Sequence, residues 1–323
     1  MTPDRDPSGG PTGPIFIVGA PRSGTTLLQY IVRSHPRLSL PTGESHFIVP
    51  LYRERERFGD LARPENVRRV LEEMWRRNRS FLATDLHGVH FDEAAIPELA
   101  ESLAAAGGGT MAGVIAALFG RNAAGEGKAR WGDKTPYYVL HMALLLEMYP
   151  AAQFIHLIRD GRDCALSTLV RRDDFHVYNF YEAARYWQHY VEVGQEVGAH
   201  LPAGSYFEIR YEDLLDDPPA TLGRLCCFLG EPYTDDLVNF RKAHEAGKTP
   251  LVAKPIQKDN QEKWRGAMSA RQLRLFEGAA GATLARNGYP LATPGDGLAW
   301  PVRVACTLHN RVLRRWRRAR KHG

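Results

Sequence analysis

Short apolar runs alternate along this chain with segments whose apolar residues follow helical spacing. Ile15–Gly19 and Gln153–Ile158 are almost wholly apolar, which is typical of strands buried on both faces. Ser205–Arg210 predicts a third strand. After each of the three predicted strands, the apolar residues follow helical spacing; these segments are Thr25–Ser34, Asp163–Arg171 and Ala220–Leu229. Strands that alternate with helices in this way indicate an α/β fold with a central parallel sheet flanked by helices.

The remaining segments are mainly helical in pattern. Helices with charged faces are predicted over Arg53–Phe58, Val67–Asn78 and Glu98–Ala106. Trp131–Lys134 is predicted to be a short polar segment, with a helix over Tyr137–Tyr149 after it. Further helices are predicted over Asn179–Val197, near 235–246, over 269–286 and over 302–320. Ligands of parallel sheets bind at the carboxyl ends of the strands, so the polar clusters behind the strands are the candidate sites.

Charge divides the chain into a body and a basic tail. The whole chain has 42 Lys and Arg against 37 Asp and Glu, a formal net charge of +5. Residues 297–323 hold seven arginines and Lys321 and no acid. Without these eight residues, 34 basic residues face 37 acidic ones, so the body carries −3. A sequence pI near 9.0 therefore does not indicate a nucleic-acid-binding body, and no nucleic-acid partner is expected.

Three parts of the chain follow from composition and charge. Residues 1–14 are rich in Pro, Gly and Asp and predict a disordered leader. Residues 15–296 form the predicted domain, and 297–323 the basic amphipathic helix. Apolar and neutral residues of that helix fall at helical spacing, namely Val302, Cys306, His309, Leu313 and Trp316. Such a helix either packs on its own domain, which we favour slightly, or lies on a bilayer with its arginines on anionic lipid.

Cysteine and histidine usage is that of a protein without a metal or disulfide framework. Cys164, Cys226, Cys227 and Cys306 form no Cys-x-x-Cys pair, so reduced thiols are expected. The histidines form no His-Glu-x-x-His motif, and no metal site is expected. No apolar run approaches the ~18 residues of a membrane span, and residues 1–14 do not resemble a signal peptide. We therefore expect a cytoplasmic protein, with peripheral membrane contact through the basic tail as an open alternative.

The first polar cluster follows the first predicted strand. Gly19 to Thr26, Gly-Ala-Pro-Arg-Ser-Gly-Thr-Thr, has the spacing of a phosphate-binding loop, in which backbone N–H groups and a helix N-terminus hold an anion. A nucleotide-triphosphatase loop requires Lys after its second glycine, where this chain has Thr25. Arg22 supplies a cation inside the loop instead. The pattern predicts a phosphate site without the lysine that triphosphates need.

The second cluster follows the second strand, in Ile-Arg-Asp-Gly-Arg-Asp-Cys-Ala-Leu-Ser from 158 to 167. Arg159 ends the strand, and Ser167 and Arg171 are four residues apart on one helix face. These three side chains would converge on one anion, which guanidinium groups bind bidentately. A surface salt-bridge cluster that includes Asp160 and Asp163 is an equally good interpretation of this segment taken alone.

Together the two clusters resemble the sulfotransferases that use 3′-phosphoadenosine 5′-phosphosulfate (PAPS). The resemblance rests on PRSGTTLL followed by IRDGRDCALST and covers about 15–290. It implies the sulfotransferase fold of the P-loop NTPase kind. In that family the first motif binds the 5′-phosphosulfate and the second binds the 3′-phosphate of the ribose. The cofactor so implied is PAPS, and the product is adenosine 3′,5′-bisphosphate (PAP).

Within the family, the chain is most similar to the branch that includes the tyrosylprotein sulfotransferases. That branch has a Glu soon after the first motif, matched by Glu44, and a Lys matched by Lys134 in Asp-Lys-Thr-Pro. An Arg-Tyr-Glu-Asp segment is matched at 210–213, and a late Lys-Trp pair by Lys263 and Trp264. His46 stands where the branch usually has Arg, which weakens the case for a protein tyrosine as the acceptor.

Sulfuryl transfer to a hydroxyl needs a base, cations at the transferring group and a donor held in line. The resemblance implies that Glu44 is the base and that Arg22 and Lys134 are the catalytic cations. The residues implied to hold the 5′-phosphate are Arg22, Ser23, Gly24, Thr25 and Thr26, with Lys263 closing over it. Those implied to hold the 3′-phosphate are Arg159, Ser167, Arg171 and Tyr211. A donor without a triphosphate demands no Mg²⁺, so no metal is required.

Two other functions stay open at this point, a P-loop kinase-like phosphotransferase and a non-catalytic membrane-associated nucleotide-binding module. The first is disfavoured by Thr25, and the second has no need of Glu44, Lys134 and Arg22. The acceptor stays undetermined among a glycan, a lipid headgroup, a small metabolite and a peptide, and the oligomeric state is undetermined as well. A set of aromatic residues is predicted to belong to the core, with an acceptor pocket as the alternative: Phe175, Tyr178, Phe180, Tyr181, Tyr186, Trp187 and Tyr190.

Overall fold

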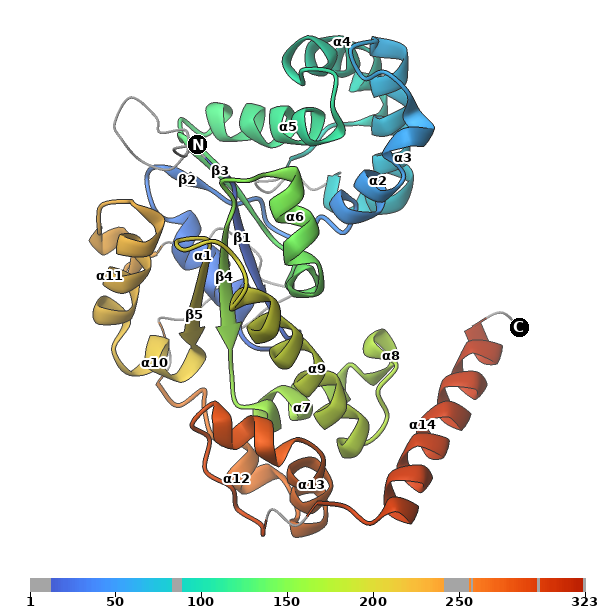
Figure 1. Ribbon diagram of the computed structural model, residues 1–323, viewed down its shortest axis with the longest axis vertical. Coiled ribbons are helices and arrows are strands. Elements are labelled where there is room, and N and C mark those ends of the chain that lie inside the picture. Colours follow the sequence, from blue (N-terminus) through green and yellow to red (C-terminus); the bar gives the residue numbers. More distant parts are fainter. Residues whose placement is uncertain (1–12, 83–88, 241–255, 257, 295–296, 322–323) are drawn as a thin grey trace.

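A five-stranded parallel sheet forms the centre of the protein, in a computed structural model that describes residues 13–82, 89–240, 256, 258–294 and 297–321 (Figure 1). The strand order is β2-β3-β1-β4-β5. The strands are β1 (Ile15–Gly19), β2 (Leu38–Ser39), β3 (Arg130–Lys134), β4 (Gln153–Ile158) and β5 (Tyr206–Arg210). The predicted α/β fold with a central parallel sheet is confirmed.

Strand β1 lies at the middle of the sheet and is buried along its whole length. It pairs with β3, with Ile17 opposite Lys134, and with β4, with Gly19 opposite Leu157. Phe16 and Val18 belong to the hydrophobic cluster on one face of the sheet, and Ile15 and Ile17 to the cluster on the other. Helices cover both faces, which is why this strand and β4 are apolar rather than alternating.

The prediction for Trp131–Lys134 was wrong, because these residues belong to the buried strand β3. Its main chain pairs with β1 on one side and β2 on the other, so its polar residues lie inside the sheet. Trp131 is in edge contact with Phe16, with ring centroids 6.0 Å apart, and packs on Phe119 at 4.8 Å. Because Asp133 and Lys134 are polar, the hydrophobicity pattern did not predict a strand here. These two residues form the end of β3, at the candidate site.

The helices agree with the predicted ones in most places. The helices before β4 are α1 (Thr25–Arg33), α2 (Ile48–Arg53), α3 (Pro64–Leu82), α4 (Ile96–Ala106), α5 (Met111–Gly125) and α6 (Met142–Met148). Those after it are α7 (Gly161–Val170), α8 (Arg172–Phe175), α9 (Phe180–Gly198), α10 (Tyr211–Asp216), α11 (Pro218–Leu229), α12 (Trp264–Ala267), α13 (Ala270–Arg286) and α14 (Trp300–Lys321). Short 3-10 turns are η1 (Arg55–Phe58), η2 (Glu93–Ala95), η3 (Pro136–His141) and η4 (Asp235–Leu237).

Three predicted helices differ from the structure. Of the helix predicted over Arg53–Phe58, Arg53 is the last residue of α2 and Arg55–Phe58 is the 3-10 turn η1. The segment predicted as one helix over Tyr137–Tyr149 is divided into η3 and α6, which meet where His141 leaves helical geometry. Of the helix predicted near 235–246, residues 241–246 lie outside the described part, and η4 covers only its start.

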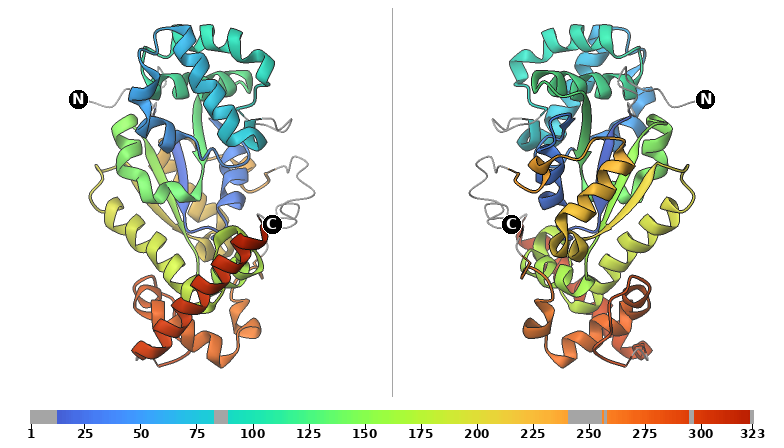
Figure 2. Two further views of the ribbon diagram at one scale, coloured as in Figure 1. Left: turned by 90° about the vertical axis from the view of Figure 1, so that its right-hand side faces the viewer. Right: turned by 90° about the vertical axis from the view of Figure 1, so that its left-hand side faces the viewer.

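Helices cover the sheet on both sides (Figures 1 and 2). Residues of α1, α10 and α11 pack against one face, and residues of α6, α7 and α9 against the other. Helices α2 to α5 form a lobe at one end of the molecule (Figure 1). In the described residues no single helix is long and apolar enough to cross a membrane, although the bent pair Glu93–Ala106 and Met111–Gly125 meets that test of length and composition jointly.

The structure describes only part of the predicted leader, residues 1–14, and most of the predicted basic tail, residues 297–323. Residues 1–12 lie outside the described residues, whereas Gly13 and Pro14, placed in the leader by the prediction, are buried. The Gly13 carbonyl accepts a hydrogen bond from Arg130, and the Pro14 carbonyl accepts one from the Gln153 N–H. These two residues therefore belong with the sheet. The basic tail is helical as predicted, in α14.

Candidate active site

The loop between β1 and α1 has the backbone of an anion cradle. Gly24 has φ +97°, and a Cβ added there would lie 2.4 Å from the Tyr211 ring. A Cβ at Gly19 would lie 2.5 Å from the Leu157 carbonyl oxygen, so both positions require glycine. Within the loop, the Ser23 hydroxyl donates to the Ala20 carbonyl at 2.5 Å. The N-cap residue of α1 is Gly24, and no side chain in the described part of the protein caps the first turn, which leaves its N–H groups for a ligand.

The side chains at the start of α1 lie beside this cradle. Thr25, the first residue of the helix, is buried, and Thr26 is half-buried. Arg22 has φ +73°, an uncommon conformation for a residue with a side chain. The compact turn thus holds one arginine in a strained backbone geometry, which is the kind of feature found at functional sites.

Arg22 joins the first motif to the second. Its Nε donates a hydrogen bond of 2.8 Å to the Ser167 hydroxyl on α7. Cys164 lies between the motifs, with its Sγ 3.8 Å from the Arg22 carbonyl oxygen and 4.0 Å from that of Arg159. Burial and the nearby charge of Arg171 lower the pKa of Arg22, and Glu44 is close enough to counteract this in part. The two motifs, distant in sequence, therefore form one site.

Arg159 leaves the end of β4 and is almost fully buried. Its Nη2 donates to the Asp163 carboxylate at 3.2 Å and to the Asn260 carbonyl at 2.9 Å. Its guanidinium lies 4.4 Å from the centre of the Tyr211 ring. Its Nε is buried and makes no hydrogen bond to any described residue. A buried guanidinium N–H without an acceptor is well suited to an anionic ligand.

Tyr211 follows β5 and connects both motifs. Its ring packs against Gly24 of the first loop and under Arg159 of the second motif. Its hydroxyl accepts a hydrogen bond of 2.7 Å from the Asn260 side chain. The tyrosine therefore does more than fill the core: it fixes the spacing between the two halves of the site.

Arg171 and Lys263 are exposed, whereas the other predicted site residues are buried or half-buried. Arg171 ends α7 with a side chain 54% exposed, and its Nε donates to Asp174 at 2.7 Å. Lys263 precedes α12 with an exposed side chain, for which the described residues provide no hydrogen bond or ion pair. Its neighbour Trp264 is buried, and the Trp264 N–H donates to Asp163 at 2.9 Å. The segment therefore contacts Arg159 through Asn260, and it contacts Asp163, the ion-pair partner of Arg159, through Trp264.

Glu44 and Lys134 form an ion pair at the ends of β2 and β3. The Lys134 ammonium lies 2.9 Å from one Glu44 oxygen, and the His46 ring lies 2.9 Å from the other. Lys134 is 3% exposed, whereas Glu44 is 37% exposed. Burial alone would raise the pKa of Glu44, but the Lys134 charge and the hydrogen bond with His46 outweigh it and lower the pKa to about 2. Glu44 is therefore a carboxylate at neutral pH.

The backbone around Glu44 is held by neighbouring elements. The Asn78 side chain donates to the carbonyls of Glu44 and Ser45 at 3.0 and 2.9 Å. Asn78 reaches them from a break in α3, where its φ and ψ are −140° and 37°. The Ser45 N–H donates to the Thr135 hydroxyl at 3.0 Å. The candidate base is thus positioned by α3 and by the residues after β3.

Three residues at the site were not predicted. Asp133, next to Lys134, is fully inside the sheet, and burial raises its pKa to about 6, although hydrogen bonds with Thr135 and Ser45 act in the opposite sense. Asn260 contacts Arg159 and Tyr211, and His46 contacts Glu44. Asp133 could have been found as the residue beside the lysine of Asp-Lys-Thr-Pro. Nothing in the local sequence marks Asn260 apart from its place before the Lys-Trp pair.

The aromatic set belongs to the core, as predicted, because its members are either buried or packed against the main hydrophobic cluster. Trp187 is 2% exposed and belongs to the core, as predicted. The half-buried Tyr186 donates to the Tyr190 hydroxyl at 3.2 Å. Burial, and to a smaller degree the charge of Glu44, raises the pKa of both tyrosines.

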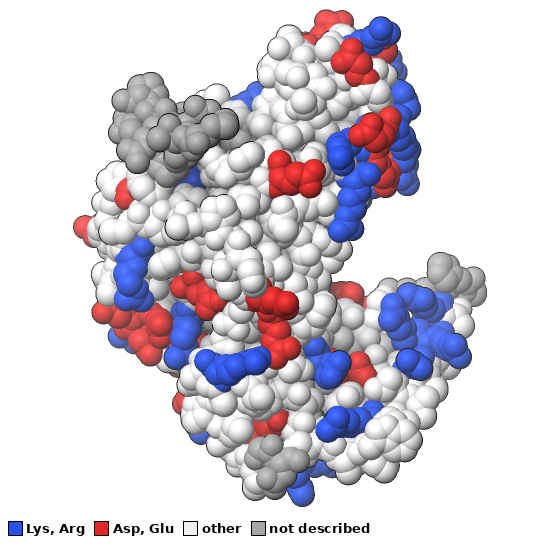
Figure 3. Space-filling model, viewed as in Figure 1, with Lys and Arg blue, Asp and Glu red and all other residues white. Residues whose placement is uncertain are grey.

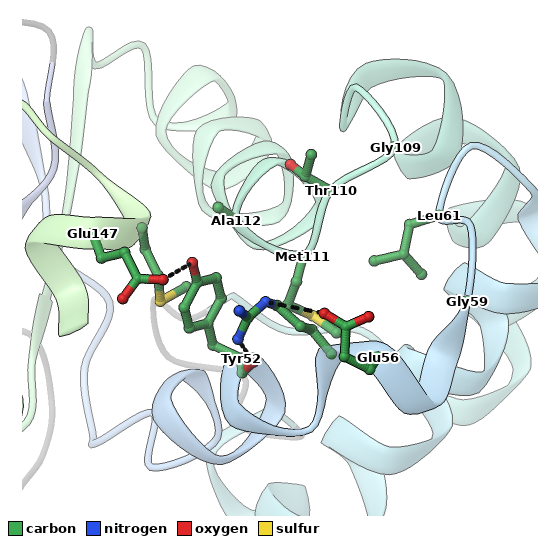
Figure 4. A pocket seen from close by; sticks show the side chains of 11 residues that line it. Tyr52, Glu56, Gly59, Leu61, Gly109, Thr110, Met111, Ala112 and Glu147 are labelled. Carbon is green, nitrogen blue, oxygen red and sulfur yellow. Dashed lines mark hydrogen bonds and ion pairs between the residues drawn. The ribbon is translucent and has the colours of Figure 1, made fainter.

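A separate cleft of about 490 Å³ lies between η1, α5 and the end of α6 (Figure 4). Tyr52 donates to Glu147 across it at 2.9 Å, and Arg55 lies beside Glu56. It contains none of the predicted site residues. Among the described residues, no group of three or more His, Cys, Asp or Glu side chains is arranged to hold a metal ion.

Comparison with known proteins agrees with this geometry. The profile of the sulfotransferase family matches residues 14–235. A protein-tyrosine sulfotransferase of Drosophila melanogaster is 24% identical over 296 residues, which is 87% of this chain and 53% of the relative. Protein-tyrosine sulfotransferase 2 of Gallus gallus is 25% identical over 87% of this chain and 70% of its own length. The chain thus spans about half the length of the Drosophila relative.

A solved structure shows the same fold. The sulfotransferase domain of the Synechococcus PCC 7002 olefin synthase superposes with a TM-score of 0.54 at 23% identity, over 86% of this chain and 98% of that domain. This similarity concerns the fold only. The profile match covers both anion-binding motifs together with Glu44, Lys134 and Tyr211. On that match, the chain belongs to the sulfotransferase family.

Proposed function

We propose that this protein transfers a sulfuryl group from PAPS to a hydroxyl group and releases PAP. The observation that carries the proposal is the contact between Arg22 and Ser167, which makes one continuous site of two anion-binding motifs. A donor with a phosphosulfate at one end and a 3′-phosphate at the other needs two such anion sites at a set distance. Tyr211 packs against both motifs and holds that distance.

The residues fit such a donor. The glycine cradle and the uncapped first turn of α1, with Ser23, Thr25 and Thr26, would hold the 5′ end. The buried Nε of Arg159 and the hydroxyl of Ser167 would hold the 3′-phosphate. Arg171 and Lys263, which the structure leaves exposed, are proposed to contact the donor as well. Thr25 occupies the position where a triphosphate site has Lys, which favours PAPS over ATP.

When bound, PAPS supplies the sulfuryl group and a phosphate leaving group. Lys134 and Arg22 place positive charge where charge develops on the leaving side. Glu44 is the proposed base, because it is ionised and partly exposed beside the buried lysine. Separation of Glu44 from Lys134 would raise the pKa of the carboxyl and make it a better proton acceptor. No role in this scheme is assigned to a metal ion.

The acceptor is proposed to be a hydroxyl compound. The Drosophila relative is named for transfer to protein tyrosine, a phenolic hydroxyl. In this chain, the half-buried Tyr186 donates a hydrogen bond to the buried Tyr190, and the charge of Glu44 influences both, which makes Tyr186 a candidate contact for the acceptor. A glycan, a lipid headgroup, a small metabolite and a peptide are all compatible with a hydroxyl acceptor.

Incubation with ³⁵S-labelled PAPS and a mixed metabolite extract tests the proposal. We expect label in a product other than inorganic sulfate, formed in step with PAP. A protein that binds PAP but leaves all label in PAPS and sulfate across a broad acceptor panel would be a binding module instead. Transfer of label from γ-³²P-ATP under the same conditions would favour the phosphotransferase alternative and contradict the proposal.

A further inference from the structure

Helix α14 exposes a line of apolar side chains that its own domain does not cover. Leu308, Val312 and Trp316 follow each other at four-residue spacing and therefore share one face. They are 53%, 63% and 47% exposed, and Trp300 at the helix start is 73% exposed. The sequence pattern had instead grouped Trp316 with Cys306 and Leu313. In the structure those two are half-buried, whereas Val302 and His309 of the same predicted group are exposed, so the exposed line coincides only in part with the predicted stripe.

The opposite face of α14 holds the helix to the domain by polar contacts. The Asn310 side-chain oxygen accepts from the Tyr178 N–H at 2.8 Å, and the Cys306 carbonyl accepts from Asn179 at 2.9 Å. Thr307 donates to Glu182 at 3.0 Å. In the left view of Figure 2, α14 lies in front of the body, with its length turned to the viewer. The helix is thus anchored in a way that leaves the apolar line outward.

Arginines border this apolar line. Arg311, Arg315 and Arg318 are exposed, and the guanidinium of Arg320 lies 4.3 Å from the centre of the Trp316 ring. Figure 3 shows basic side chains gathered over the upper part of α14, beside a hollow that separates the helix from the lobe of α2 and α3. Residues 297–323 contain no acid. An apolar strip bordered by arginines, with tryptophan at its edge, matches the layering of an anionic bilayer surface.

The geometry points to α14 as a membrane-docking helix that lies in the interface of a bilayer containing anionic phospholipid. Leu308, Val312 and Trp316 enter the headgroup region, and the arginines contact lipid phosphates. The positive charge of α14 favours an anionic lipid surface over a second copy of this chain as the partner of its exposed face. A second copy of this chain would bring two helices of like charge together, whereas an anionic lipid surface neutralises them. Docking concerns the outer face of α14 and is independent of the donor site.

Sedimentation with vesicles tests the docking. We expect the full chain to bind phosphatidylcholine vesicles with about 30% phosphatidylglycerol at ~0.1 M salt, and neutral vesicles at least ~10-fold more weakly. The variant Leu308→Gln/Val312→Gln/Trp316→Gln should weaken binding to anionic vesicles at least ~10-fold. Arg311→Gln/Arg315→Gln/Arg318→Gln should weaken it and flatten its salt dependence.

Matched controls separate docking from general effects. Tyr233→Gln/Leu291→Gln removes exposed apolar side chains elsewhere, and Arg63→Gln/Arg68→Gln/Arg271→Gln removes the same charge elsewhere. Both should bind vesicles like the parent. Thermal unfolding should be unchanged in the apolar triple variant, and Val312→Gln alone replaces it if the fold is weakened. Equal binding by the parent and the apolar variants, or no preference for anionic vesicles, would overturn the inference, as would a change in oligomeric state without any vesicle binding.

Discussion

The Glu44–Lys134 ion pair sets the protonation state of the candidate base. A nearly buried ammonium at 2.9 Å keeps Glu44 ionised far below neutral pH. In the proposed scheme the same lysine also stabilises the transferring group, so this ion pair would link the base to the charge that aids departure of the leaving group. A single contact between two side chains therefore sets the protonation state of the candidate base.

Replacement of Glu44 by Gln tests the role of the base. Without a carboxylate, turnover should fall by about 10²- to 10⁴-fold, because no positioned group takes the hydroxyl proton. PAP affinity should stay within about three-fold, as judged by calorimetry, since the proposed role of Glu44 is that of the base and not of a phosphate ligand. Glu56→Gln, at an exposed acid of η1, is the matched control and should leave both quantities unchanged. Full turnover by Glu44→Gln would remove Glu44 from the mechanism.

Arg159 and Ser167 should act on binding rather than on the chemical step. We expect Arg159→Ala to weaken PAP binding at least ~10-fold, since a buried guanidinium contributes about 1.5–3 kcal/mol per charged hydrogen bond. Ser167→Ala should weaken it less. The exposed Arg172, on α8, provides the control Arg172→Ala. Unchanged affinity in Arg159→Ala by isothermal calorimetry would show that the 3′-phosphate binds elsewhere.

Asp133 gives the site a dependence of stability on pH. Its pKa of about 6 in the folded protein lies above the ordinary value, so the folded state favours the protonated form. The stability that the folded state gains from protonated Asp133 is fully present below about pH 4 and is lost as the pH rises through 6. Asp133→Asn should therefore be more stable than the parent by roughly 2–3 kcal/mol at pH 7.5, with a smaller difference at pH 4. Urea unfolding at both values measures this, and a difference that does not change with pH would contradict it.

At the scale of elements, the loop after β1 combines a required backbone shape with a required neighbour. The left-handed conformation of Gly24 admits no side chain without strain, and the Tyr211 ring fills the space where a Cβ would lie. Sequence spacing predicted the loop, the strand before it and the helix after it. It did not predict β3, because a strand that ends in Gly-Asp-Lys has too few apolar residues to stand out.

Gly24→Ala tests the shape of this loop. The added methyl should push Tyr211 away from Arg159, and PAP affinity should fall at least ~10-fold with a loss of stability of about 1–2 kcal/mol. Gly120→Ala is the matched control, because a Cβ there meets nothing within 4 Å inside α5. That change should stabilise the protein by up to about 1 kcal/mol and leave PAP binding intact. Equal PAP affinity in both variants, measured by calorimetry, would contradict the cradle.

For the whole molecule, the parallel sheet explains why distant motifs meet. The segments after β1, β3, β4 and β5 all lie at the carboxyl edge, and this rule of sheet topology made the site predictable from sequence. The partners within the site could not be predicted in the same way. Arg22 bonds to Ser167, and Arg171 to Asp174, because of side-chain directions that spacing does not specify. The contacts of Asn260 with Arg159 and Tyr211 join residues that are distant in sequence, and no sequence pattern predicts them.

For the basic tail, the sequence predicted the helix but not the face by which it packs on the body. Composition predicted a basic amphipathic helix, and α14 is a helix. Which of its faces packs on the body depends on polar contacts of Asn310 and Thr307 with residues around the start of α9. The net charge of +5 is therefore the sum of a mildly acidic body and a basic outer helix. These two parts call for separate tests, one with nucleotides and one with vesicles.

A calorimetric titration with PAP, adenosine 5′-monophosphate and ATP with Mg²⁺ tests the central claim most directly. If the two motifs hold the two ends of PAPS, PAP should bind at least ~10-fold more tightly than adenosine 5′-monophosphate, because Arg159 and Ser167 recognise the 3′-phosphate. ATP with Mg²⁺ should bind weakly, and Arg159→Ala should remove the preference for PAP. Equal affinity for PAP and adenosine 5′-monophosphate, or tighter binding of ATP with Mg²⁺, would contradict the account.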